Sequence, residues 1–142
     1  MVPMDGGPTV RRELDRSEVL QRVGSVSHGR VVFTQRALPA IRPVNHILDG
    51  DRIVICSHGS TALAEAARAG AVLAFQADEI DPVLRAAWSV VLTGLGWLVG
   101  DQAEAARYRT ALSAWLGTEP GEIIRIDPEM VTGFELRPAG RT

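Results

Sequence analysis

The chain has 142 residues, 46% of them hydrophobic, which is long enough for one domain with a real core and too short for two comfortable ones. This composition excludes a disordered chain, and the formal net charge of −2 gives no reason to expect nucleic acid or a membrane surface as a partner. No apolar run reaches the roughly eighteen residues of a membrane span, and no basic segment followed by an apolar one opens the chain. We therefore expect a soluble, cytoplasmic protein.

Residues 1–14 are predicted to form a flexible arm, because the first ten residues include two prolines and two glycines. A short helix over residues 17–23 follows, with Asp15 or Ser17 as its N-cap and Gly24 as its stop. The β-branched and aromatic run at residues 31–33 then predicts a strand over residues 29–35.

A β-hairpin is predicted around Asp49-Gly50, because two β-branched segments flank a dipeptide that tolerates the positive φ of a tight turn. Its first strand contains Pro43, which cannot donate to a ladder. Such a proline belongs at an edge, at a bulge or against something other than a strand, such as a planar ligand. Its second strand contains Cys56, the only cysteine, which cannot form an internal disulfide. We interpret Cys56 as a small buried hydrophobe rather than a reactive thiol.

The segment after this hairpin reads Ser57-His58-Gly59-Ser60-Thr61 and runs into an alanine-rich helix. A strand that ends in a small, polar turn at a helix start presents unpaired backbone N–H groups. Together with the helix dipole, these groups favour an anion such as a phosphate. Beside the apolar hairpin, the turn therefore suits a flat, phosphorylated cofactor. The alternative is a plain helix N-cap supplied by Ser60 or Thr61.

Five further elements are predicted in the second half of the chain. Gly94 and Gly96 lie on one face of the longest strand and permit the strong bend that a small barrel needs. Asp101-x-x-Glu104 is a variant of the capping box and opens a helix with one apolar stripe. The elements are a strand over residues 71–77 that the polar segment 78–82 ends, a strand over 88–99, a helix over 101–116, and short strands over 122–126 and 131–136, before a tail at 138–142.

Short strands joined by tight turns, with helices inserted between them, indicate a β-rich α+β fold in which an antiparallel barrel carries peripheral helices. The classical dinucleotide fold is not expected, because Gly94-x-Gly96 sits within a strand rather than between a strand and a helix. We see no internal repeat.

Catalytic side chains are not apparent in the sequence. His28, His46 and His58 are the only histidines and lack the spacing of metal ligands, so we predict no metal site. No G-x-S-x-G nucleophile elbow occurs. The carboxylates of residues 78–81 are interpreted as a solvated turn. His46 is the one side chain that we would test as an acid or base.

Four stretches carry a family resemblance through their order along the chain. They are Pro43-Val44-Asn45-His46 with the following Asp-Gly and Ile-Cys-Ser-His-Gly-Ser, then residues 71–78, 88–94 and 124–133. In this order they resemble the flavin-binding split-barrel proteins related to pyridoxamine 5′-phosphate oxidase, most closely the small branch that includes nitroimidazole-resistance proteins. The resemblance covers about residues 15–136.

The resemblance implies an FMN-binding split-barrel domain of six strands over residues 15–137, a homodimer, and two FMN sites at the dimer interface. It implies an oxidoreductase that moves hydride between a nicotinamide cofactor and a small acceptor of unknown identity. By position, three groups of residues would bind the cofactor. Pro43, Val44, Asn45 and His46 would line the flavin ring, Ser57, His58, Gly59, Ser60 and Thr61 would hold the phosphate and ribityl chain, and Trp88, Ser89 and Val90 would approach the ring or the rim of the site.

One departure from the family pattern bears on the cofactor. Thr61 stands where the family often has Lys or Arg, so a phosphate would lose a charge-assisted partner. Arg36, Arg42 or Arg68 could substitute, or the helix N-terminus could serve alone. The alternatives therefore remain a deazaflavin-dependent reductase, a non-enzymatic flavin- or heme-binding protein, and a split barrel without a cofactor.

Overall fold

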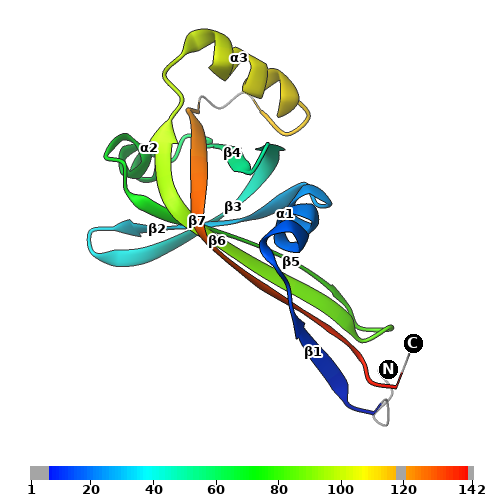
Figure 1. Ribbon diagram of the computed structural model, residues 1–142. Coiled ribbons are helices and arrows are strands. Elements are labelled where there is room, and N and C mark those ends of the chain that lie inside the picture. Colours follow the sequence, from blue (N-terminus) through cyan, green and yellow to red (C-terminus); the bar gives the residue numbers. More distant parts are fainter. Residues whose placement is uncertain (1–6, 118–120, 141–142) are drawn as a thin grey trace.

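The computed structural model describes residues 7–117 and 121–140, which fold into one antiparallel sheet of seven strands with three helices (Figure 1). The strand order is β1-β7-β4-β3-β2-β5-β6, and β6 pairs with β7 as well, which closes the sheet into a barrel. The elements are β1 (Thr9–Glu13), α1 (Arg16–Gly24), β2 (His28–Gln35), β3 (Leu38–Asp49), β4 (Arg52–Cys56), α2 (Thr61–Arg68), β5 (Val72–Asp81), β6 (Ala86–Leu98), α3 (Gln102–Ala111) and β7 (Ile123–Pro138). The predicted β-rich α+β barrel with peripheral helices is confirmed.

Strand β7 runs without interruption through the segment that was expected to separate two short strands. Its register with β6 shifts at one point, where Thr93 pairs with Met130 but Gly94 pairs with Pro128. The shift is a bulge, a place where a proline without an N–H is tolerated. A Cβ on Gly94 would lie 1.8 Å from the carbonyl oxygen of Asp127. The backbones of β6 and β7 can approach this closely only because residue 94 is glycine.

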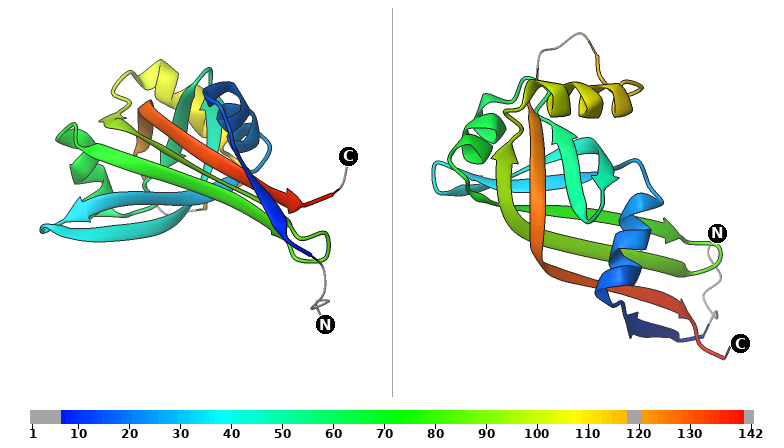
Figure 2. Two further views of the ribbon diagram at one scale, coloured as in Figure 1. Left: turned by 60° about the horizontal axis from the view of Figure 1, so that its bottom comes forward. Right: turned by 45° about the horizontal axis from the view of Figure 1, so that its top comes forward.

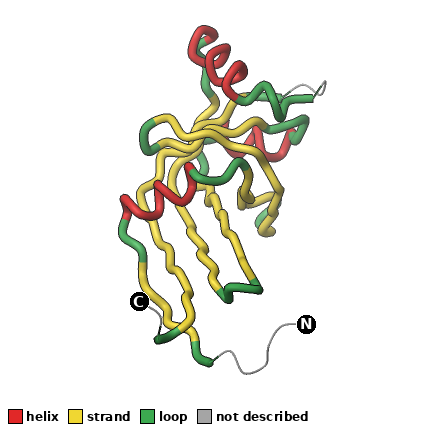
Figure 3. Tube along the Cα trace, turned by 90° about the vertical axis from the view of Figure 1, so that its right-hand side faces the viewer, coloured by secondary structure: helices red, strands yellow, loops and turns green. Residues whose placement is uncertain are grey.

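Beyond the barrel, the ends of β5, β6 and β7 continue together as a projecting arm, which Figures 1 and 3 show clearly. The sequence predicted that the polar segment 78–82 would end β5, and this was wrong. The strand continues to Asp81 because β6 supplies a partner for each residue, down to the pair Asp81 and Ala86. The Asp81 carboxylate then accepts hydrogen bonds from the N–H groups of Val83 and Leu84, which fixes the turn at the tip.

Strand β1 adds a fourth strand to this arm, beside the C-terminal half of β7 (Figure 2). Residues 9–13 were expected to belong to a flexible arm, so that prediction was wrong for them, and β1 is the strand beyond the six implied by the family resemblance. Arg12 donates from Nε to Glu135 at 2.9 Å, and the Arg11 guanidinium lies 3.9 Å from the Phe134 ring centroid. These contacts hold the strand on β7. Residues 1–6 of the expected arm lie outside the described residues.

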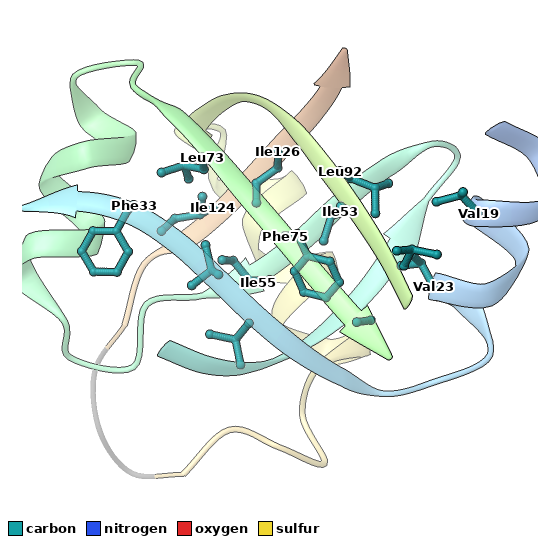
Figure 4. Packing of buried hydrophobic residues seen from close by; sticks show 14 of the residues in the cluster. Val19, Val23, Phe33, Ile53, Ile55, Leu73, Phe75, Leu92, Ile124 and Ile126 are labelled. Carbon is teal, nitrogen blue, oxygen red and sulfur yellow. The ribbon is translucent and has the colours of Figure 1, made fainter. Parts of the chain in front are cut away.

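The barrel interior holds one apolar cluster, to which every barrel strand contributes (Figure 4). Helix α1 closes one end of it with Val19 and Val23, and α2 contributes Leu63 and Ala67. Of the two N-caps predicted for α1, the structure has Asp15, and Glu18 completes a reciprocal capping box with it. The core residues shown in Figure 4 come from elements far apart in the sequence, so the barrel packs as a unit.

A second, smaller cluster lies outside the barrel wall beneath α3. It contains Cys56, which is 2% exposed, so its interpretation as a buried hydrophobe is confirmed. Tyr108 contributes its ring and donates its hydroxyl to the Asp49 carboxylate, which ties α3 to the β3–β4 turn. The helix ends at Ala111, earlier than predicted, and Trp115 is 47% exposed rather than part of the apolar stripe.

Replacement of Gly94 by alanine is expected to destabilise the fold by about 1–3 kcal/mol, because its methyl group has no room against Asp127. Gly100→Ala is the matched control, since a Cβ there meets nothing within 4 Å. Urea unfolding of both variants measures the difference. Equal midpoints would show that the bulge does not depend on glycine.

Candidate functional site

Strand β3 lies between β2 and β4 in the sheet, but each of its residues pairs with only one of these two strands. Residues 46–49 pair with β4, whereas residues 38–45 pair with β2 and, among the described strands, with no other. Pro43 lies among residues 38–45, opposite Arg30 of β2. The other backbone edge of β3 is therefore open beside Pro43, directly next to the turn that follows β4.

The alternation of β3 divides the four residues that were expected to line a flavin ring. Val44 and His46 are 6% and 3% exposed and point into the barrel. Pro43 is exposed, and Asn45 is half-buried with its amide donating to the carbonyl of Ser27 at 3.2 Å. Only Pro43 and Asn45 lie on the outer face, because neighbouring side chains on a strand point to opposite sides.

The contacts of His46 give this side chain a structural role. Its Nε2 lies 2.8 Å from the carbonyl oxygen of Val23, so this nitrogen carries the proton. Its ring makes an edge contact with Phe75 at 4.8 Å, and Nδ1 has no hydrogen-bond partner within the part of the chain that is described. Burial lowers the pKa of His46 below its usual value. A neutral imidazole that joins β3 to α1 is not positioned to act as an acid or base on the outer face.

The turn after β4 is held in shape by its own side chains. His58 and Gly59 both adopt positive φ, +48° and +79°. Ser57 and Glu122 exchange two hydrogen bonds of 2.9 Å, one from the Ser57 N–H and one to the Ser57 hydroxyl. The Ser60 hydroxyl caps α2 by accepting from the N–H of Leu63. Of the three residues whose hydroxyls were expected at the phosphate, Ser57 and Ser60 are buried and only Thr61 is exposed.

A pocket of about 380 Å³ opens at this turn. The first N–H groups of α2 have no intrahelical partner, and the first turn of α2 carries no acidic residue, unlike α1 and α3. The charged residues of the lining are Arg68, Glu65 and Glu122, a formal charge of −1, and Arg68 lies 3.6 Å from Glu122. The pocket thus offers a phosphate the backbone donors of α2 and Thr61, whereas its charged side chains sum to a negative lining. Arg36 and Arg42 are not part of the lining.

A polar network that the sequence analysis missed lies on the outer sheet face beside Pro43. Arg30 donates from Nη1 to the Gln76 amide oxygen at 2.8 Å, and Gln76 Nε2 donates to Asp78 at 3.1 Å and to the Ser89 hydroxyl at 3.4 Å. Arg30 also lies 3.5 Å from Asp78. The register places Pro43, Arg30 and Gln76 in one row across β3, β2 and β5.

One signal in the sequence could have indicated this network. Gln76 is the single polar residue in the apolar run of residues 72–77, and the alternation of that strand puts it on the outer face. The charged partners come from separate segments, and Asp78 was interpreted as part of a solvated turn. It is instead a strand residue opposite Ser89.

Trp88, Ser89 and Val90 do not share one surface. Ser89 joins the outer network, whereas Val90 is fully buried in the core. Trp88 is 6% exposed on the inner face, where its indole donates to Glu79 at 3.3 Å and the Arg22 guanidinium lies 6.0 Å from its ring. It lines a separate hollow of about 1140 Å³ on the concave side of the arm.

The outer sheet face around the network is mostly apolar. Ile41 and Met130 are 62% and 65% exposed at the two ends of a row that crosses β3, β2, β5, β6 and β7. None of the three helices covers this face, since their buried residues pack into the barrel interior or, for α3, on β4 and the start of β7. Other exposed apolar residues on the same face of β5 and β6 are Val72, Val91, Leu95 and Trp97.

In the ranges 7–117 and 121–140, no group of three or more His, Cys, Asp or Glu side chains could hold a metal ion. Over the same ranges, no helix has both the length and the apolar character needed to cross a membrane.

Comparison with known proteins assigns this architecture to a family. The family model described as pyridoxamine 5′-phosphate oxidase matches residues 15–135. The chain belongs to the pyridoxamine 5′-phosphate oxidase family. The uncharacterized protein Rv0080 of Mycobacterium tuberculosis is 44% identical over 134 residues, which is 92% of this chain and 88% of that protein.

Two solved structures superpose on most of this chain and have the same fold. The structure of an FAD binding protein from Mycobacterium smegmatis is 29% identical, covers 88% of this chain and 98% of its own, and superposes with a TM-score of 0.71. A candidate 5-nitroimidazole antibiotic resistance protein from Bacteroides thetaiotaomicron is 9% identical, with a TM-score of 0.70 over 91% of this chain and 89% of its own. The split-barrel architecture implied by the family resemblance is thereby confirmed.

The neutral state of His46 predicts a pH-dependent stability. Its pKa is lowered in the fold, so the unfolded chain binds the proton more readily, and stability should fall as the pH drops through about 6.5 towards the folded value. His46→Phe should lose less stability over this pH range. His58→Asn is the control, because asparagine tolerates the positive φ of that position. Urea unfolding between neutral and mildly acidic pH measures the slopes, and equal slopes for native and His46→Phe protein would contradict the assignment.

Proposed function

We propose that the chain binds a flavin at the outer sheet face and acts as an oxidoreductase on a small acceptor. The observation that carries the proposal is the polar network of Arg30, Gln76, Asp78 and Ser89, set in an apolar face beside the open edge at Pro43. Such a mixture of apolar wall and a few convergent polar groups is typical of cofactor sites. The similarity to an FAD binding protein supports a flavin as the cofactor.

Each part of this surface has a role in the proposal. The backbone N–H groups at the start of α2, with Thr61, hold the phosphate, and Pro43 and Asn45 line the ring. A bound flavin supplies the redox chemistry, so the chain's own residues need only bind, orient and exclude water.

The choice between FMN and FAD depends on the pocket charge. FMN ends in a phosphate monoester with nearly two negative charges, as phosphate esters have a second pKa near 6, whereas each phosphate of FAD is a singly charged diester. The lining has a formal charge of −1 and lacks the basic residue at Thr61. FMN is the cofactor implied by the family resemblance, and this lining makes FAD the second candidate.

A second copy of the chain would complete the site. The exposed side chains of Ile41, Val91 and Met130 surround the network on the uncovered outer face. Covering them with the same face of a partner would bury apolar area and exclude water from a ring held between the copies. We therefore propose a homodimer.

Flavin titration tests the proposal. FMN, FAD and riboflavin are added to the purified chain, and tryptophan and flavin fluorescence are followed. Thr61→Lys should tighten FMN binding about tenfold by adding a charge-assisted hydrogen bond and leave riboflavin binding unchanged. Thr9→Lys, at an exposed position in the arm, is the control for added charge.

The outcomes separate the candidate functions. Binding of FMN or FAD by the native chain supports the flavin proposal and makes a nicotinamide-oxidation assay worthwhile. Absence of binding to native and Thr61→Lys protein alike would overturn it. A deazaflavin absorbance at the violet edge, a heme Soret band or a colourless chain would then identify which alternative applies.

A further inference from the structure

The outer network has a fixed orientation, because every polar atom of the Gln76 amide is used. Its oxygen accepts from Arg30, and its nitrogen donates to both Asp78 and Ser89. An amide bonded at both ends cannot flip without losing all of these bonds. The network therefore holds the side chains of Arg30, Asp78 and Ser89 in one arrangement before any ligand arrives.

The groups that remain available form a short row of donors and an acceptor. Arg30 has five N–H donors, of which few are used inside the network, and its side chain is 42% exposed. The Asp78 carboxylate is 34% exposed and can accept more than one hydrogen bond. The Ser89 hydroxyl accepts from Gln76 and still has its own proton to donate. The surface thus presents a guanidinium donor, a carboxylate acceptor and a hydroxyl donor.

We propose that this row recognises the pyrimidine edge of the isoalloxazine ring, which carries a carbonyl, an N–H and a second carbonyl in sequence. Asp78 accepts the ring N–H, while Arg30 and Ser89 donate to the carbonyls on either side. The inference rests on the proposed flavin function and assigns the residues that select the ring. Because the reduced flavin ring becomes anionic at this edge, the Arg30 cation also favours the reduced form.

Stability alone gives little reason for such a network. An exposed ion pair on a sheet surface contributes at most about 1 kcal/mol, and the row on one side of Arg30 and Gln76 runs from Ile41 to Met130 through Val32 and Ala74. Arg30 and Gln76 of the network also lie in the same row as Pro43, next to the open edge of β3 and on the face that no helix covers. These observations distinguish it from the other exposed arginine–aspartate pairs of the chain.

One of those pairs provides a matched control. Arg52 lies 3.5 Å from Asp127 with its side chain 46% exposed, which is close to the 3.5 Å and 42% of Arg30 with Asp78. Arg30→Gln and Arg52→Gln therefore remove the same charge from similar surroundings. Arg30→Lys keeps the charge and loses the planar fork of the guanidinium.

The experiment uses riboflavin, which lacks a phosphate and so reports on the ring site without the turn. Arg30→Gln and Asp78→Asn should each weaken riboflavin binding about tenfold, while Arg52→Gln binds like the native chain. The midpoint potential of bound flavin should fall in Arg30→Gln and stay near the native value in Arg30→Lys. Riboflavin methylated at the ring N–H should bind the native chain more weakly, and Asp78→Asn should no longer distinguish it from riboflavin.

Two results would overturn the assignment in different ways. Suppose that Arg30→Gln, Asp78→Asn and Arg52→Gln all bind riboflavin with native affinity and the midpoint potential of bound flavin is unchanged. The proposed flavin function then stands, but the network does not recognise the ring. If the native chain binds neither riboflavin, FMN nor FAD, the proposed function itself fails, and this inference fails with it.

Discussion

The pairing of β7 with three other strands is the constraint on which the rest of the structure depends. Its first part pairs with β4 and β6 and closes the barrel, and its last part pairs with β6 and β1 in the arm. The bulge opposite Gly94 separates the two parts. Because a bulge bends a strand and increases its twist, one strand can complete the barrel and then leave it.

The candidate site lies where this closure leaves backbone unpaired. Strand β4 is short and covers only residues 46–49 of β3, so the edge beside Pro43 stays open. The chain after β4 must instead turn sharply into α2, and the two hydrogen bonds between Ser57 and Glu122 hold that turn against the start of β7. The open edge and the turn are thus consequences of the same short strand, and the outer polar row lies beside them because Arg30 of β2 pairs with Pro43.

Most helices and strands could be predicted from the sequence, but which residues share one face of the sheet could not. The turn at Asp49-Gly50, the α1 cap at Asp15 and the bend at Gly94 follow from local backbone chemistry, which a sequence displays directly. The extension of β5 through Asp78 and the single strand β7 depend on partners distant in the chain, and these override local polarity.

The role of His46 was missed because its neighbours Val23 and Phe75 come from other elements. Arg30 and Gln76 were missed for the same reason, since only the sheet register brings them together.

We propose that the outer polar row and the turn before α2 belong to one ligand site, separate from the hollow in the arm. Amide and side-chain NMR of the labelled chain during riboflavin addition tests this most directly. A ligand at this site should cause the largest shifts at Arg30, Gln76 and Ser89, with added shifts at Gly59 and Thr61 when FMN replaces riboflavin. Shifts centred instead on Arg22, Trp88 and Glu135 would place the ligand in the hollow of the arm and rule out a site on the outer face.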